Sequence, residues 1–239
     1  MKALLIVLLA CLPQLSWAFT AEVLAKQWMA EGIHHNQGLE LTLAPWVEDG
    51  SFIPLDLVLT GAEPPVSISL LRSEEPDPRI AQITVQEWAE PLRLSTRVRL
   101  PQSQSLIVLA RDGQGRVWSA RQDIEVLASS CMTPMPSARP VNFGQVRVWV
   151  DGEHERALRT VLHHPMETGR RPDLAGGFLP RHLPTLFEIN SAGNNVLRAE
   201  PFEGLSVNPY WRLILPARSH AISIRWVDAD GSQFSAELP

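Results

Sequence analysis

The feature that most constrains the fold of this chain is an alternation of apolar and polar residues with a period of two. Leu39–Leu43, Leu55–Leu59 and Leu92–Leu100 carry apolar side chains at nearly every second position. Successive side chains of a β-strand point to opposite faces, so this pattern predicts strands with one buried and one solvated face. Val66–Leu70 and Val117–Val126 are also expected to be strands. The first half of the chain is therefore predicted to be an antiparallel β-sandwich.

A second series of alternating segments begins after residue 141. The strands expected there are Val146–Val150, Ala157–Leu162, Leu186–Ile189, Val196–Ala199, Trp211–Leu215 and Ile222–Trp226. The turns expected in the two series are Glu48–Gly50, Pro76–Pro78, Arg111–Gly113, Ser191–Asn194 and Asp228–Gly231. The sequence thus predicts two β-sandwiches, residues 19–128 and 142–239, joined by a proline-rich linker over residues 129–141. Fusion raises their effective concentration, so the two domains are expected to dock on each other.

The amino-terminal residues predict export. Residues 1–18 have the layout of a secretory signal peptide, with Lys2, an apolar stretch over Ala3–Leu12 and a small residue at Ala18. No other segment approaches about 18 uninterrupted apolar residues, so we expect no membrane span in the mature chain and a periplasmic location. An alternative interpretation takes Cys11 as the lipidated first residue of a lipoprotein.

One short helix is expected at the start of the mature chain. Over Thr20–Glu31, Val23, Leu24 and Trp28 recur at helical spacing, and Thr20 is a suitable amino-terminal cap. Every predicted element after this helix is a strand. The fold class expected is therefore all-β with one short amino-terminal helix.

The charge of the chain argues against nucleic acid as a partner. There are 21 lysines and arginines against 26 aspartates and glutamates, for a formal net charge of -5. The basic residues are scattered and nowhere form a run of five, whereas binding to a phosphate backbone requires a basic patch or stripe. We therefore predict no nucleic-acid function.

Cys131 lies in the linker between the two predicted sandwiches. If cleavage follows Ala18, it is the only cysteine of the mature chain. An unpaired thiol in an oxidising compartment is either a reactive group or a site for an intermolecular bond, although many free cysteines are buried and act as small apolar residues. The neighbours Ser129, Ser130 and Pro134 are poor core residues. The sequence therefore favours an exposed, functional thiol.

Histidines and tryptophans offer other kinds of site. The histidines that might assemble a copper or zinc site are His34, His35, His154, His163, His164 and His182. Adjacent histidines on a strand point to opposite faces, so each pair gives one ligand at most, and we predict no metal and no cofactor. Trp149, Trp211 and Trp226 fall within strands, where core packing is expected. A Gly-x-Ser-x-Gly nucleophile elbow is absent from the sequence, so a serine hydrolase is not expected.

Several motifs carry a resemblance to a known family. The most specific of them is the string His164, Pro165, Met166, Glu167, Thr168 and Gly169. With Leu179–His182, Val207–Tyr210 and Val227–Gly231 after it, this part of the chain resembles SoxZ of the periplasmic sulfur-oxidation system. Upstream, Leu41–Pro45, Glu48–Gly50 and Ile53–Leu55 are similar to its partner SoxY. In combination the chain resembles the fused SoxYZ-like carriers associated with quinoprotein dehydrogenases.

The resemblance implies both a fold and a role. It implies two immunoglobulin-like sandwiches and a carrier that is not itself an enzyme. Cys131 aligns with the cysteine that holds sulfur intermediates covalently, and His164–Gly169 align with the SoxZ signature, implied to be an inter-domain or partner contact. The implied partners are Sox-type enzymes, or a PQQ-dependent quinoprotein dehydrogenase or its cytochrome.

One part of the chain departs from the family pattern. The family cysteine lies in a glycine-rich free tail, whereas Ala128–Ser130 precede Cys131 here and Met132–Pro134 follow it. Proline removes the backbone freedom that glycine provides, and the chain continues into the second domain. Two hypotheses result: a periplasmic carrier that uses Cys131, and an interaction module that docks on a dehydrogenase or its cytochrome without covalent cargo.

Overall fold

Sixteen strands and one helix build the part of the chain that the structure, a computed structural model, describes: residues 20–129, 133, 140–152 and 156–238. The elements of the first half are α1 (Ala21–Met29), β1 (Ile33–His35), β2 (Leu39–Thr42), β3 (Trp46–Asp49), β4 (Ile53–Leu59), β5 (Val66–Arg72), β6 (Arg79–Val85), β7 (Leu92–Val98), β8 (Gln104–Arg111) and β9 (Arg116–Ala128). Those of the second half are β10 (Val146–Asp151), β11 (Ala157–Leu162), β12 (Pro184–Ser191), β13 (Asn194–Pro201), β14 (Tyr210–Ile214), β15 (Ile222–Asp228) and β16 (Gln233–Leu238). The predicted all-β class is confirmed. The predicted leader, Cys11, Cys131 and His154 lie outside the described residues.

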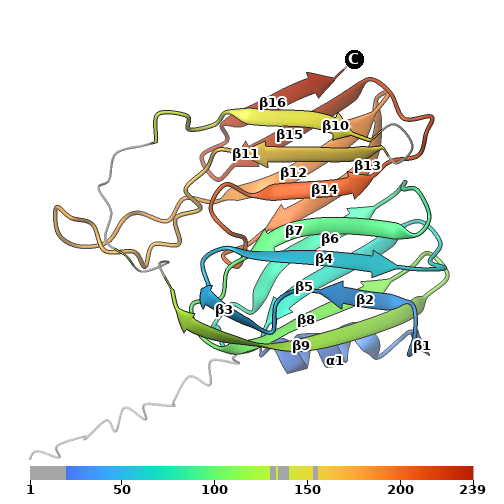
Figure 1. The fold of residues 1–239 in the computed structure, drawn as a ribbon, viewed down its shortest axis with the longest axis horizontal. Helices are drawn as coiled ribbons and strands as arrows, with labels where there is room; N and C mark the ends of the chain where they lie inside the picture. Colours follow the sequence, from blue (N-terminus) through green and yellow to red (C-terminus); the bar gives the residue numbers. More distant parts are fainter. Residues whose placement is uncertain (1–19, 130–132, 134–139, 153–155, 239) are drawn as a thin grey trace, which may run out of the picture.

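The amino-terminal helix forms where the sequence predicts it. The Oγ1 of Thr20 accepts a hydrogen bond from the backbone N–H of Val23 at 3.3 Å, which satisfies one of the free donors of the first turn. Helix α1 lies against the outer face of the larger sheet (Figure 1). Its apolar side, with Leu24 and Trp28, covers Ile107 and Leu109 of β8. The helix therefore buries a face of the sheet that would otherwise be wet.

Both sheets run without interruption from the first half into the second. The larger sheet has the strand order β1-β9-β8-β5-β6-β13-β12-β15-β16, with β3 paired to β9, and the smaller has the order β10-β11-β14-β7-β4-β2. The strands of the first half continue into those of the second (Figure 1). We use the term interface for the two strand pairs that join the halves, β6 with β13 and β7 with β14. Both pairs are antiparallel.

A single hydrophobic core extends across this interface. One cluster of buried apolar residues includes Ile53 and Leu94 of the first half together with Trp211 and Trp226 of the second. The rings of Trp211 and Trp226 pack on Phe187, with centroids 5.4 and 4.3 Å apart. The predicted core role of these two tryptophans is confirmed. Trp149 is only half-buried, because β10 is an edge strand of the smaller sheet.

Five strands were not predicted: β1, β3, β6, β8 and β16. In β8 both faces are buried, since Leu106 and Val108 enter the main core while Ile107 and Leu109 lie under α1. A strand covered on both sides has a continuous apolar run and no alternation. In β6, the alternation of Ala81, Ile83 and Val85 was present but short. The others are short or lie at sheet edges.

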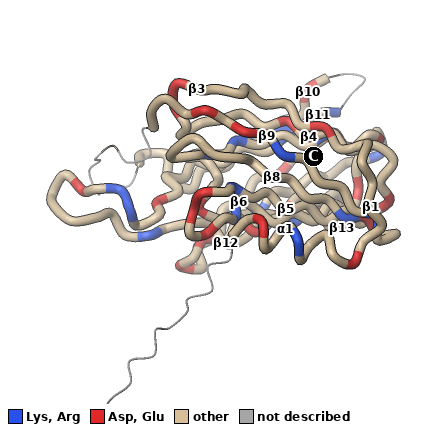
Figure 2. Tube along the Cα trace, turned by 90° about the horizontal axis from the view of Figure 1, so that it is seen from below, with Lys and Arg blue, Asp and Glu red and all other residues tan. Residues whose placement is uncertain are grey.

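The predicted turns fall between strands. The turn between β12 and β13 has positive φ at Ala192 (48°) and Gly193 (81°), which suits a tight hairpin. Within the described residues, no helix is both long and apolar enough to cross a bilayer. Acidic and basic residues are intermingled along the described chain (Figure 2).

Candidate functional site at the interface

The segment His164–Gly169 forms a partly buried turn after β11. His164 is 1% exposed, and its Nδ1 accepts a hydrogen bond from the backbone N–H of Met166 at 3.0 Å. The backbone N–H of His164 donates to Oδ1 of Asn208 at 3.1 Å, and the N–H of Asn208 donates to the carbonyl of His164 at 2.9 Å. Met166 has a φ of 53°, in the left-handed region that non-glycine residues seldom adopt. His164 and Asn208 therefore hold a strained backbone in place.

Arg99 reaches from the first half into this turn. It follows β7 and is 6% exposed. Its Nη2 donates to the carbonyl of Met166 at 2.7 Å, and its Nε donates to the carbonyl of Glu203 at 2.6 Å. Both acceptors belong to the second half. A guanidinium cannot be deprotonated, so a permanent positive charge lies buried at the end of the interface.

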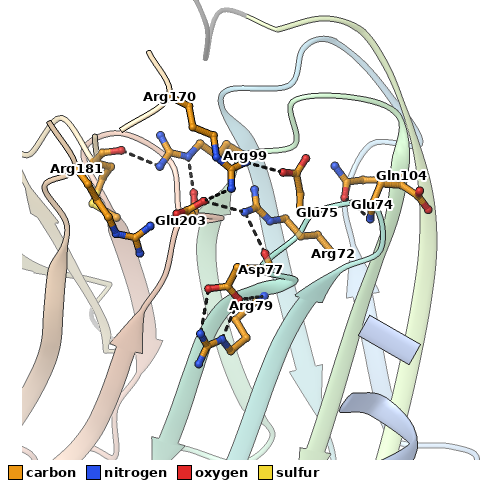
Figure 3. A network of polar contacts seen from close by, with 11 residues as sticks. Arg72, Glu74, Glu75, Asp77, Arg79, Arg99, Gln104, Arg170, Arg181 and Glu203 are labelled. Atoms are coloured by element: carbon orange, nitrogen blue, oxygen red, sulfur yellow. Dashed lines mark hydrogen bonds and ion pairs between the residues drawn. The ribbon is translucent and has the colours of Figure 1, made fainter. Parts of the chain in front are cut away.

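Further arginines and glutamates gather around Arg99. Figure 3 shows Arg72, Arg170 and Arg181 arranged around the carboxylate of Glu203. Nη2 of Arg170 lies 3.1 Å from Glu203 Oε2, and Nη2 of Arg72 lies 3.8 Å from the same oxygen. Arg181 also pairs with Glu203. One buried carboxylate is thus shared by three guanidiniums.

A cavity of about 40 Å³ lies within this group of charges. Its lining residues come from both halves: Arg72, Glu75, Arg99, Pro101, Glu167, Thr168, Arg170, Arg171 and Glu203. Glu167 and Thr168 belong to the predicted signature, and Glu167 pairs with Arg171 at 3.2 Å. Pro165 lines a neighbouring cavity of about 210 Å³ that also includes Pro140. The signature therefore lies along two cavities at this end of the interface.

A second buried polar group links the signature turn to the last hairpin. Nε2 of His164 and Nε2 of His182 lie 3.2 and 2.7 Å from Oδ2 of Asp228, and the ring of Phe143 packs against both imidazoles. Burial acts to raise the pKa of Asp228. The hydrogen bond and charge of His164, the backbone N–H of Ala229 and the charge of His182 together outweigh burial and hold that pKa below its usual value.

These three side chains also have the composition of a metal site, since their potential ligand atoms lie within 4.8 Å of one another. The hydrogen-bond pattern does not suit a metal. Nδ1 of His164 accepts the N–H of Met166, so in the neutral ring the proton lies on Nε2 and is directed at Asp228. A metal at Nε2 would require a ring without either proton, whereas metal-bound histidines donate from their other nitrogen. The group fits a hydrogen-bonded network.

Comparison with protein families gives two matches, one in each half. A family model described as sulfur oxidation protein SoxY matches residues 25–131, and one described as sulphur oxidation protein SoxZ matches residues 150–239. The chain is a fused SoxY–SoxZ protein. It belongs to a family of sulfur carrier proteins, as the motifs predict. Its assignment to the quinoprotein-associated type stays a prediction.

Two comparisons with solved structures match one part of the SoxY–SoxZ chain each. The sulfur carrier protein SoxY from Chlorobium limicola f thiosulfatophilum is 18% identical, with a TM-score of 0.38 over 46% of this chain and 97% of that one. A superoxide reductase (neelaredoxin) from Ignicoccus hospitalis is 17% identical, with a TM-score of 0.33 over 38% of this chain and 80% of that one. No curated protein matches the chain.

Sequence reasoning missed most of the charged residues at this site. Arg72 and Arg99 come from the SoxY half, whereas Arg170 and Glu203 come from the SoxZ half. Their separation in sequence reaches 131 residues between Arg72 and Glu203, so no local pattern links them. A signal was present in Arg99 alone, a charged residue beside the apolar Val98 and Leu100.

Proposed function

We propose that this protein is a periplasmic carrier, not itself an enzyme, that holds a sulfur-containing or thiol-reactive intermediate covalently on Cys131. One observation carries the proposal: the match to the SoxY family model ends at residue 131, which is this cysteine. A thiolate is the form of cysteine that attacks sulfur compounds, and it forms persulfides or mixed sulfur adducts.

The described residues on either side of Cys131 support a presenting role. The backbone N–H of Gly50 donates to the carbonyl of Ala128 at 3.0 Å, and the N–H of Leu100 donates to the carbonyl of Gly50 at 2.7 Å. The end of β9 is therefore fixed beside Leu100, next to the cavity residues Arg99 and Pro101. Pro140, where description resumes, lines the neighbouring cavity. The linker thus begins and ends close to the site.

The signature residues support the same proposal as an inter-domain contact. Met166 accepts a hydrogen bond from Arg99, and Glu167 and Thr168 line the cavity that both halves form. Gly169 has a φ of 82°, which glycine adopts without strain. We therefore assign His164–Gly169 to the docking of the SoxZ half on the SoxY half.

The chemistry of loading implies a redox partner. Joining a cysteine thiolate to the sulfur of a second anion forms an S–S bond and releases two electrons, which a partner must accept. Sox-type enzymes are the first candidates, and a PQQ-dependent quinoprotein dehydrogenase or its cytochrome is the other class proposed. Both classes accept electrons in the periplasm.

Intact-mass spectrometry of the protein purified from its native periplasm tests the carrier role. We expect a mass increment on Cys131 that a thiol reductant removes, and no such increment on a Cys131→Ser variant. A matched control is Ser129→Ala, which keeps the thiol and should keep the increment. A thiol that is always unmodified and resists alkylation would contradict the carrier role.

A second candidate function is docking on a partner without covalent cargo. The segment between β11 and β12 projects from the side of the sandwich (Figure 1), and Leu174 and Phe178 on it are 68% and 67% exposed. A bridge between Pro172 and Phe178 shapes this segment into a small hairpin. Growth of a Cys131→Ser strain on every sulfur and alcohol substrate tested, with loss of growth in a Leu174→Ser, Phe178→Ser strain, would favour this function.

A further inference from the structure

We propose that the arginine-lined cavity at the interface binds a tetrahedral dianion of the class of sulfate and thiosulfate. The site consists of described residues from both halves, chiefly Arg72, Arg99, Arg170 and Arg171. It is distinct from the covalent site proposed at Cys131 and does not depend on it. The ligand would be held by charge and hydrogen bonds alone.

The first argument is the balance of charge. Among the described residues that line the cavity or contact its carboxylates there are five arginines (Arg72, Arg99, Arg170, Arg171 and Arg181) and three glutamates (Glu75, Glu167 and Glu203). With all of them ionised, the group has a net charge of +2. A dianion would neutralise this excess, whereas a cation or a neutral ligand would not.

The second argument is burial. Arg72 is 3% exposed and Arg99 6%, and Glu203 is 4% exposed. Taking charges out of water costs several kcal/mol per ion, and replacing such groups by apolar side chains is often neutral or stabilising. Charges held in this position are therefore poorly explained by stability, and a charged ligand gives them a purpose.

The third argument is the fixed direction of the guanidiniums. Arg99 is held by two backbone carbonyls, and Arg72 donates from Nη2 to the carbonyl of Asp77 at 3.2 Å. A guanidinium held in place loses little entropy when it binds an oxyanion, and its planar fork matches two oxygens at once. Arg170 is 44% exposed in its side chain and lies at the mouth of the cavity, where it pairs with Glu75 at 3.2 Å.

The fourth argument is size. A cavity needs about 10–15 Å³ to hold one water molecule, so 40 Å³ gives room for about three. One tetrahedral oxyanion occupies a comparable space. A nucleotide or a peptide would not fit within it, so we assign the site to a small inorganic anion.

Titration calorimetry on the Cys131→Ser protein tests the site without covalent chemistry. Sodium sulfate and sodium thiosulfate would be titrated at constant ionic strength, with sodium acetate as the planar monoanion. We expect saturable binding of both dianions with a stoichiometry of one, and none of acetate. In Arg170→Gln, Arg171→Gln the affinity should fall about tenfold or more, because each charge-assisted hydrogen bond contributes about 1.5–3 kcal/mol.

Two matched variants sharpen the result. Arg218→Gln removes an exposed arginine that pairs with Glu87 and contacts no residue of the cavity, so sulfate binding should not change. Glu75→Gln removes a carboxylate that competes for Arg170, so the affinity should rise several-fold. Near-ultraviolet circular dichroism identical to that of the parent would show that each variant is folded.

Absence of saturable sulfate and thiosulfate binding would overturn the proposal, as would equal affinity in the parent and the folded Arg170→Gln, Arg171→Gln variant. These outcomes are separate from the test of the carrier role. A protein that binds sulfate but never carries a mass increment on Cys131 would retain this site and lose the covalent function.

Discussion

The interface between the halves has two parts that differ in kind. Along the strand pairs it is apolar: Trp211 faces Thr96 in the register of β14 with β7, and Leu197 faces Val85 in that of β13 with β6. At its end it is charged, with Arg99 and Glu203 buried together. The strand pairs need only backbone hydrogen bonds and apolar faces to join the halves. The charged end is therefore the part that structural joining does not require.

This difference suggests a division of roles. The apolar part supplies most of the stability of the docked halves, because burial of apolar area is the largest favourable contribution to folding. The charged part contributes less per residue, since desolvation offsets much of the attraction between its charges. Substitutions in the two parts should separate stability from ligand binding.

The largest effect is expected for Trp211→Ala in the apolar part. The ring is fully buried and stacks on Phe187, so its loss removes buried area and leaves a cavity. We expect a decrease of about 3–5 kcal/mol in the free energy of unfolding in urea. Trp149→Ala, at the half-buried edge strand β10, is the matched control and should cost clearly less. Equal losses would contradict the role given to the apolar part.

A smaller effect is expected for Arg99→Met at the charged end. The change removes two hydrogen bonds and leaves the carbonyls of Met166 and Glu203 without this donor, but it also removes a buried charge. We expect a loss of about 1–3 kcal/mol on unfolding, measured in the same way. The exposed Arg218→Met should change stability by less than about 0.5 kcal/mol. A loss larger than that of Trp211→Ala would reverse the ranking of the two parts.

The smallest effect is expected for Asp228→Asn, and it should depend on pH. The pKa of Asp228 is lower in the folded protein than its usual value of 3.8. Its carboxylate therefore adds stability above that value, and the contribution is lost as the pH falls through the folded-state pKa. At pH 7 the variant should be less stable by about 1 kcal/mol, and the difference should shrink toward pH 2.

Urea unfolding at a series of pH values between 2 and 7 measures this difference. Asp56→Asn, which changes an exposed carboxylate on β4, serves as the control. A difference between Asp228→Asn and the parent that stays constant over the series would show that the ionised carboxylate is not what stabilises the group of His164, His182 and Asp228.

Much of the fold follows from local patterns. The alternation in segments such as Leu55–Leu59 predicts strands, because one face of each is buried and the other is exposed or half-buried. The cap at Thr20 and the turn at Asp228–Gly231 follow equally from local chemistry. Strand β8 escaped prediction because helix α1 covers its second face, and that cover depends on tertiary packing.

The candidate site divides in the same way. The string His164–Gly169 was readable because its turn is held by neighbours in sequence, such as the contact from Met166 to His164. The pairing of β6 with β13 and of β7 with β14 was not readable, since the sequence predicted two sandwiches and gave no register between them. The arginines around Glu203 follow from that pairing.

The sequence by itself determined the class of fold, the family and the location of the single mature cysteine in the linker, because these depend on residues close together along the chain. Only the tertiary structure decided that both sheets cross the interface and that arginines from both halves surround one cavity there. The physical reason is that strand pairing between the halves depends on contacts more than 100 residues apart in sequence, such as that of Ile83 with Ala199. No local pattern of side chains specifies such a contact.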